Sequence, residues 1–261
     1  MSVKTARKVS RVILGLASIA SLVAHAAPGV AYRHPNLLTL AAEGRQIFDH
    51  TPQYASRYVG NSLSCESCHL GAGNRPFTAP LWGAVPVYPR FQKKAHRVVD
   101  FNQRVRECFL FSEDGHAPPL NGHVVEAIEA YAAYLTYNRD VPDGRLPVGA
   151  GYVPPLKTTA GSVADGRAEF ALNCSTCHGI DGQGKEIRAR LYAPPLWGAR
   201  SFAQGAGMSK PAMAARFIWE NMPYGHGRSL SPQVARNIAD FVDSHARPAP
   251  KSAIGSLWDR P

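Results

Sequence analysis

Several features are missing from this sequence. Apolar and polar residues nowhere alternate over a sustained stretch, which excludes a protein built mainly from half-buried strands. The basic residues form no long run, so nucleic-acid binding is a poor interpretation. The apolar stretch from Val12 to Val23 is too short to span a bilayer comfortably. Between Met1 and Met208 the chain has no methionine, so its first half offers no thioether ligand to a metal.

The N-terminal residues predict export. Basic residues precede the apolar stretch, and Ala24-His25-Ala26 after it is typical of a signal-peptidase site; the basic residues are Lys4, Arg7, Lys8 and Arg11. We interpret residues 1–26 as a cleaved signal peptide, with an uncleaved anchor as the alternative, and predict a periplasmic protein. Removing these four of 29 basic residues leaves 25 against 19 acidic ones, a net charge of +6. That balance suits a small anionic substrate or an acidic redox partner.

Four of the five cysteines belong to two Cys-x-x-Cys-His motifs, at residues 65–69 and 174–178. In this motif two thiols form thioethers to a porphyrin and the adjacent histidine binds the iron. A single motif also occurs in zinc and redox sites, but two motifs behind an export signal indicate two covalently attached haem c groups. The predicted attachment residues are Cys65, Cys68, Cys174 and Cys177, and the predicted proximal iron ligands are His69 and His178.

An internal repeat predicts the architecture. Each motif follows a Gly-Arg segment, at Gly44 and Gly166, and precedes a Pro-Leu-Trp-Gly-Ala segment and a helical pattern ending near residues 135 and 242. We predict an all-α protein with two class I cytochrome c-like domains, at residues 27–140 and 161–250. Residues 141–160, rich in proline and glycine, read as an extended linker. The first domain also has a stretch from Tyr88 to Phe111 that we predict as a long loop.

The second domain offers methionines as the sixth iron ligand. Met222 follows a predicted helix over 211–221 and precedes Pro223, which ends the helix and turns the thioether toward the haem. Met208 in a glycine-rich loop is an alternative, and Met213 fits the helix core. Thioether ligation raises the haem potential, as an electron-exit haem requires.

The first domain must use another ligand. Cys108 is the remaining cysteine, and Arg104 and Arg106 favour its thiolate form. A buried free thiol is the alternative role for Cys108. The alternatives to Cys108 as the sixth iron ligand are a histidine and an open position. The nearby histidines are His96, His116 and His123. A thiolate ligand would lower the potential, so electrons would run from the first haem to the second.

The segments Tyr58–Leu70, Tyr88-Pro89 and Arg104–Phe109 resemble the thiosulfate dehydrogenase family over most of the mature chain. The resemblance implies oxidation of two thiosulfates to tetrathionate at a first haem ligated by His69 and Cys108. It implies a second haem, ligated by His178 and Met222, that passes electrons to a cytochrome or similar acceptor. In the family the residue before that methionine, here Asn221, can compete for the iron.

Positive charge near Cys108 suits a dianionic substrate. Arg104 and Lys94 can donate charge-assisted hydrogen bonds to sulfonate oxygens, and Ser112 can add a neutral donor. The Cys108 thiolate either stays on the iron or leaves it and carries a sulfur adduct. The chain departs from the family pattern, which has arginine at Lys94 and Phe111 and asparagine at Asp114.

Two other functions are compatible with the sequence. A non-catalytic dihaem electron-transfer cytochrome needs only the two haem motifs. A thiosulfotransferase cytochrome subunit, related to the A-type cytochrome of the sulfur-oxidation system, shares the His/Cys ligation and would copurify with a partner. We expect the enzyme, an interpretation that rests on Cys108 and the basic stretch around it.

Overall fold

The computed structural model describes residues 35–139, 146–188 and 191–257. The predicted signal peptide, residues 1–26, and the first part of the predicted linker lie outside the described residues. Within the described ranges, no helix is long and apolar enough to cross a membrane.

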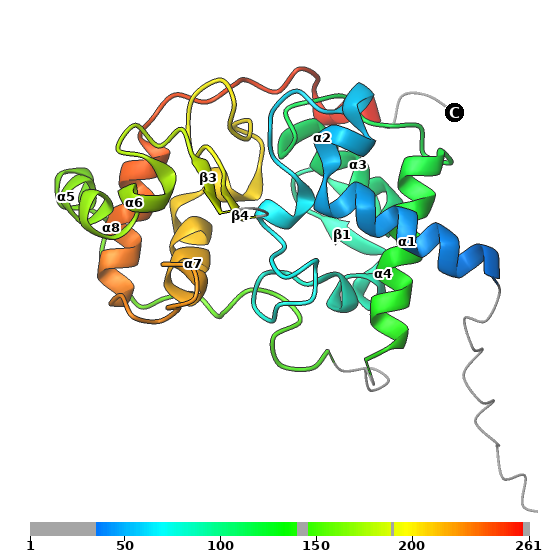
Figure 1. Ribbon diagram of the computed structural model, residues 1–261, viewed down its shortest axis with the longest axis horizontal. Helices are drawn as coiled ribbons and strands as arrows, with labels where there is room; N and C mark the ends of the chain where they lie inside the picture. The colour runs from blue at the N-terminus through cyan, green and yellow to red at the C-terminus, as the bar shows by residue number, and fades with distance from the viewer. Residues whose placement is uncertain (1–34, 140–145, 189–190, 258–261) are drawn as a thin grey trace, which may run out of the picture. The chain divides into compact units, whose positions relative to one another are not determined.

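The first domain is built on two long helices, α1 (Pro35–Asp49) and α4 (His123–Tyr137), which pack against each other (Figure 1). Gly44 permits their close approach, because a Cβ there would lie 1.9 Å from the Ala127 carbonyl oxygen. Phe48, Trp82 and Tyr131 fill the core beside this crossing. The shorter elements are α2 (Thr51–Tyr54), β1 (Arg90–Gln92), β2 (Arg97–Val99) and α3 (Phe101–Phe111).

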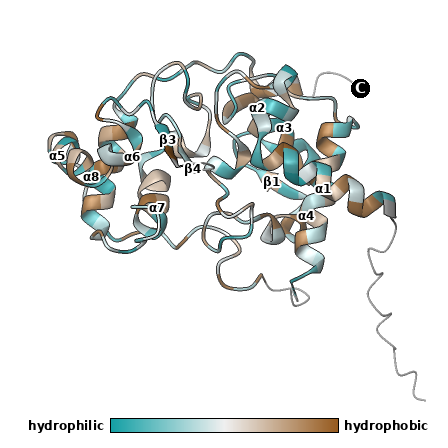
Figure 2. Ribbon diagram, viewed as in Figure 1, coloured by the Kyte–Doolittle hydropathy of each residue, from teal (hydrophilic) through white to brown (hydrophobic). Residues whose placement is uncertain are grey.

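The second domain repeats this crossing with α5 (Val163–Asn173) and α8 (Pro232–Asp243). Gly166 lies where Gly44 does, with its Cβ position 2.1 Å from the Asn237 carbonyl oxygen. Brown and teal positions alternate along α8 in Figure 2, as expected of a helix with one apolar face. The remaining elements are α6 (Ser175–His178), β3 (Lys185–Arg188), β4 (Leu191–Ala193) and α7 (Pro211–Asn221). The predicted helices over 124–135, 211–221 and 234–242 are confirmed.

The predicted long loop over 88–111 is wrong. This stretch contains an antiparallel hairpin, β1 with β2, followed by the eleven-residue helix α3. Asp100 caps α3 by accepting a hydrogen bond from the Gln103 backbone N–H at 2.7 Å, and the Gln103 side chain accepts from the Asp100 N–H in return. Val105 and Phe109 pack one face of α3 against the core of the first domain. In the sequence, the arginines of α3 interrupt the apolar pattern that would have revealed this face.

The chain after α8 returns to the first domain as a C-terminal strap, residues 246–257, drawn in red in Figure 1. The Pro248 carbonyl accepts a hydrogen bond from the Gln204 N–H at 3.0 Å, and the Leu257 carbonyl accepts one from Arg106 Nη1 at 2.9 Å. Leu257 is buried in an interdomain cluster formed by Leu63, Leu110, Phe111, Phe202, Ala206 and Leu257. Both domains therefore share this core.

Candidate functional site: two haem-attachment motifs and helix α3

The two motif histidines are held in the same way. His69 Nδ1 lies 2.7 Å from the Ala79 carbonyl oxygen, and His178 Nδ1 lies 2.9 Å from that of Pro194. A carbonyl partner fixes Nδ1 as the donor and leaves Nε2 to bind a metal. Burial lowers the pKa of both imidazoles, so both favour the neutral form that ligates iron.

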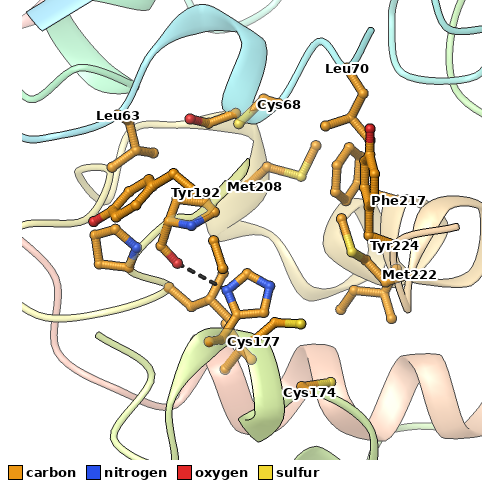
Figure 3. A pocket seen from close by; sticks show the side chains of 18 of the residues that line it. Leu63, Cys68, Leu70, Cys174, Cys177, Tyr192, Met208, Phe217, Met222 and Tyr224 are labelled. Atoms are coloured by element: carbon orange, nitrogen blue, oxygen red, sulfur yellow. Dashed lines mark hydrogen bonds between the residues drawn. The ribbon is translucent and has the colours of Figure 1, made fainter. Parts of the chain in front are cut away.

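A cavity of about 650 Å³ lies beside the second motif and is lined by Cys174, Cys177 and His178 (Figure 3). Its other walls are mostly apolar, formed by Phe170, Leu196, Phe217, Ile218, Ile238 and Val242. Two thiols, an oriented imidazole and apolar walls fit a haem c group.

Met222 lines the same cavity, and Figure 3 shows it with Phe217 and Tyr224. It follows the last residue of α7 with extended backbone angles, φ −120° and ψ 147°, so the helix end directs it to the cavity. Met208 lines the same cavity close to Cys68 of the first motif. Asn221 is 1% exposed, donates through Nδ2 to the Phe217 carbonyl at 3.2 Å, and is absent from the described cavity lining.

The first motif begins with the 3-10 turn Cys65–Ser67. The Thr51 hydroxyl accepts a hydrogen bond from the Cys65 backbone N–H at 3.1 Å, which fixes the start of the motif. Burial, Glu113 and then Cys108 raise the pKa of Cys68 to about 12, so Cys108 on α3 lies within electrostatic range of the motif. The two motif thiols and the oriented His69 fit the other haem c group, and Cys108 is the remaining thiol within electrostatic range of them.

Arg104 lies one helical turn before Cys108 and interacts with it. The charge of Cys108 is the largest cause that raises the pKa of Arg104, ahead of the opposing effect of burial. Arg104 Nη1 also donates to Glu107 Oε2 at 2.6 Å, and the Glu107 side chain is fully buried. The predicted cation is therefore present, but part of its charge is balanced by a carboxylate.

Lys94 and Ser112 lie at the edges of this group. Lys94 Nζ donates to the Gly205 carbonyl at 2.6 Å and lies 3.0 Å from the centroid of the Phe111 ring. Burial, followed by the charge of Arg104, lowers the pKa of Lys94 to about 8. Ser112 caps the end of α3, and its backbone N–H donates to the Cys108 carbonyl at 2.7 Å.

The departures from the family pattern have structural counterparts. Phe111 is 4% exposed in the interdomain cluster and packs against Gly205, so an apolar contact stands where the family pattern has arginine. Asp114 is 5% exposed, and its carboxylate lies 3.7 Å from Lys251 Nζ of the strap. The alternative ligands His96, His116 and His123 are all exposed, and His123 pairs with Glu43 at 3.1 Å.

Four side chains that had no role assigned from the sequence lie near Cys108 in the structure or interact with it electrostatically. Glu107 and Glu113 are buried, and burial together with Cys108 raises the pKa of Glu113 far above its usual range. Tyr88 and Tyr152 interact electrostatically with Arg104 and Cys108. The Arg104–Glu107 spacing of three residues is a helical ion-pair spacing and could have revealed Glu107. No local pattern marks Tyr152, which lies in the predicted linker.

Comparison with known proteins agrees with this geometry. Residues 52–139 match a family model described as "SoxA/TsdA, cytochrome c domain", and residues 163–246 match one described as "Cytochrome c". The chain is 41% identical over 220 residues to thiosulfate dehydrogenase of Stutzerimonas stutzeri, covering 84% of this chain and 71% of that protein. It is 40% identical over 215 residues to thiosulfate dehydrogenase of Thiomonas intermedia, covering 82% and 68%.

A solved structure is also similar. The thiosulfate dehydrogenase (TsdBA) of Marichromatium purpuratum, in its "as isolated" form, superposes with a TM-score of 0.76 at 31% identity. The match covers 86% of this chain and 51% of that one, so this chain spans about half the length of that relative. Fold and motifs thus define a mostly helical protein with two cytochrome c domains. The chain belongs to the thiosulfate dehydrogenase family of oxidoreductases.

Proposed function

We propose that this protein oxidises thiosulfate to tetrathionate: two S2O3²⁻ ions form one S4O6²⁻ ion and release two electrons. The observation that carries the proposal is the grouping of Cys108 and Arg104 on α3 beside the first motif. A polarizable sulfur and a cation next to a redox cofactor are what this reaction needs. The relatives that share this fold are named for the same activity.

The site geometry supports the following assignment of ligands. Cys65 and Cys68 would attach the first haem and Cys174 and Cys177 the second, with His69 and His178 as proximal ligands. Cys108 would be the distal ligand of the first iron and Met222 that of the second, because Met222 lies on the wall of the second cavity. Once bound, the two haems supply one-electron acceptors and the connection to an external acceptor.

The substrate would be held by the cations around Cys108. Arg104 keeps one guanidinium face toward Glu107, and its remaining N–H groups are available to a sulfonate. Lys94 adds a second positive charge, since its ammonium interacts with both Arg104 and Cys108. Two dianions repel each other, so at least two cations are required to hold them with their sulfur atoms in contact.

Both motifs border one cavity. The cavity beside the second motif is also lined by Cys68, which belongs to the first motif, and by Met208 (Figure 3). Such a shared wall supports fast electron exchange between the domains. We further propose that the chain acts in the periplasm after loss of residues 1–26, because haem c attachment and the N-terminal pattern both require export.

The test is turnover by the purified holoprotein with thiosulfate and an artificial electron acceptor, with tetrathionate quantified. One tetrathionate for every two electrons transferred is the expected result. If dithionite reduces both haems and thiosulfate reduces neither, the protein is an electron carrier and the proposal is wrong. A tightly copurifying cytochrome subunit would instead support the thiosulfotransferase role.

A further inference from the structure

A segment between the two domains pairs with the loop that supports His69. The Gly149 carbonyl accepts a hydrogen bond from the Phe77 N–H at 2.8 Å. The Gly151 carbonyl accepts one from the Ala79 N–H at 3.0 Å. The carbonyl of the same Ala79 is the partner of His69 Nδ1 at 2.7 Å. The position of this segment therefore decides where the acceptor of His69 lies.

The loop needs this support, because two of its residues have unfavourable backbone angles. Phe77 has a φ of 63° and Ala79 a φ of 49°, and neither is a glycine. The left-handed region is sterically unfavourable for a residue with a Cβ, so such a conformation persists only where the surroundings hold it. Between these two residues, the fully buried Thr78 forms a β-bridge with Tyr152. The pairing thus keeps Ala79 in a conformation that the loop alone would leave.

The segment is anchored in turn by the second domain. Arg216 of α7 donates through Nε to the carbonyl of Val153, the residue after Tyr152. Its guanidinium lies 5.9 Å from the centroid of the Tyr152 ring. Val153 is 3% exposed, so this hydrogen bond is shielded from water. A chain of contacts therefore runs from α7, through Val153 and the paired segment, to the carbonyl that orients His69.

The histidine of the second motif is supported within its own domain. The Pro194 carbonyl, which is the partner of His178 Nδ1, directly follows strand β4, and β4 pairs with β3 of the same domain. A change at Arg216 should therefore disturb the support of His69 and leave that of His178 in place.

We propose that Arg216 is a positioning residue for the first haem: it holds the segment between the domains and, through it, the carbonyl that orients His69. An acceptor at Nδ1 makes an imidazole a more basic ligand, and a more basic ligand favours ferric iron and a low potential. The second domain thereby helps to set the potential of the haem in the first. The inference rests on the ligation proposed above, because it needs a haem bound to His69.

The decisive variant is Arg216→Met, which keeps an unbranched side chain and removes its donors. At the wild-type midpoint potential, the ratio of reduced to oxidised first haem should rise roughly threefold to tenfold, the effect of weakening one hydrogen bond. The same ratio for the second haem should not rise. Redox titration of the holoprotein in the visible spectrum measures both haems, and the second-haem spectrum reports that its domain is folded.

A matched variant separates positioning from a simple charge effect. Arg216→Gln also removes the charge, but its amide nitrogen stands at the same place in the side chain as the arginine Nε and can still donate to Val153. Its first-haem ratio should stay close to that of wild type. Loss of a cation alone would favour ferric iron, so it would lower the ratio, and it would do so equally in both variants.

A further control lies elsewhere in the second domain. Arg236 of α8 pairs with Asp240 of the same helix, so Arg236→Met should leave both ratios unchanged. An unchanged or lowered first-haem ratio in Arg216→Met would overturn the proposal, and so would equal shifts in Arg216→Met and Arg216→Gln. The titration needs no thiosulfate. A wild type without turnover would therefore overturn the proposed function and leave the potentials to decide on Arg216.

Discussion

The two motifs share one mode of histidine support and differ in the helix that carries the candidate iron ligand. Each histidine donates to a backbone carbonyl, and each motif lies beside a glycine-mediated helix crossing. In the second domain, Met222 follows the end of α7 and lines a mostly apolar cavity. In the first domain, the middle of α3 carries Cys108 with Arg104 and the buried Glu107. We infer that one scaffold supports two chemistries through these two helices.

The largest effect is expected from Cys108→Ala. Thiosulfate turnover should fall by at least about a hundredfold, because the sulfur ligand and any sulfur adduct are lost together. The first-haem spectrum should change while the second-haem spectrum stays constant, measured on the purified oxidised and reduced protein. If turnover stayed unchanged in Cys108→Ala, the Cys108 sulfur would not distinguish the first haem site chemically from the second.

Met222→Leu should act on the other site only. Loss of the thioether should lower the second-haem midpoint potential by roughly 0.1–0.2 V, since axial ligands set much of a haem potential. KM for thiosulfate should not change.

Met208→Leu is the matched control in the same cavity. The midpoint potential of the second haem in this variant should remain near that of wild type. The reverse result, with Met208→Leu lowering the potential, would make Met208 the ligand. Redox titration followed in the visible spectrum distinguishes the two.

The pH dependence of KM tests Lys94 in the first site. Its pKa is lowered to about 8 by burial and by Arg104, so it loses its proton as the pH rises through about 8. KM for thiosulfate should therefore rise roughly two- to fivefold between pH 7 and 9, the size of a solvent-exposed charge contact. Lys94→Met should have a flat profile, with a KM above that of wild type at pH 7 and close to it at pH 9. A Lys94→Met profile that still rises near pH 8 would assign the titration to another group.

The smallest effects are expected when the N-cap side chain of α3 or of α8 is removed. Asp100→Ala removes the cap of α3, and Ser231→Ala removes that of α8, whose hydroxyl accepts from the Val234 N–H at 3.2 Å. Each should lower the free energy of unfolding by about 1 kcal/mol, measured by denaturant titration. Only Asp100→Ala should also raise KM, because α3 carries Cys108 and Arg104. If Ser231→Ala raised KM as much as Asp100→Ala does, the idea that α3 alone carries the substrate site would be wrong.

The sequence was sufficient for the architecture because its strongest patterns are local. The two Cys-x-x-Cys-His motifs, the repeated Gly-Arg segment and the Ser231-Pro232 helix start each involve residues close in the chain. The helix over 211–221 and the position of Met222 after it could be predicted for the same reason.

Helix α3 was missed because Arg104 and Arg106, which are half-buried in the structure, gave the sequence the appearance of a solvated loop. Its capping box, Asp100 with Gln103, was a local pattern that could have revealed it. Tyr152 could not be found in this way. Its place against the loop of the first motif depends on a β-bridge to Thr78, seventy-four residues earlier, and on Arg216 of the other domain. Periodicity within a short window carries no information on such contacts.

The C-terminal strap affects how this protein unfolds. Leu257 fills a cluster with Leu63 and Leu110 of the first domain and Phe202 of the second. Cutting the chain between the domains would leave apolar surface exposed on each half. We therefore expect calorimetry of the holoprotein to show a single cooperative melting transition, with neither half stable as an excised fragment. The distance between the two haem sites is then a property of one folding unit.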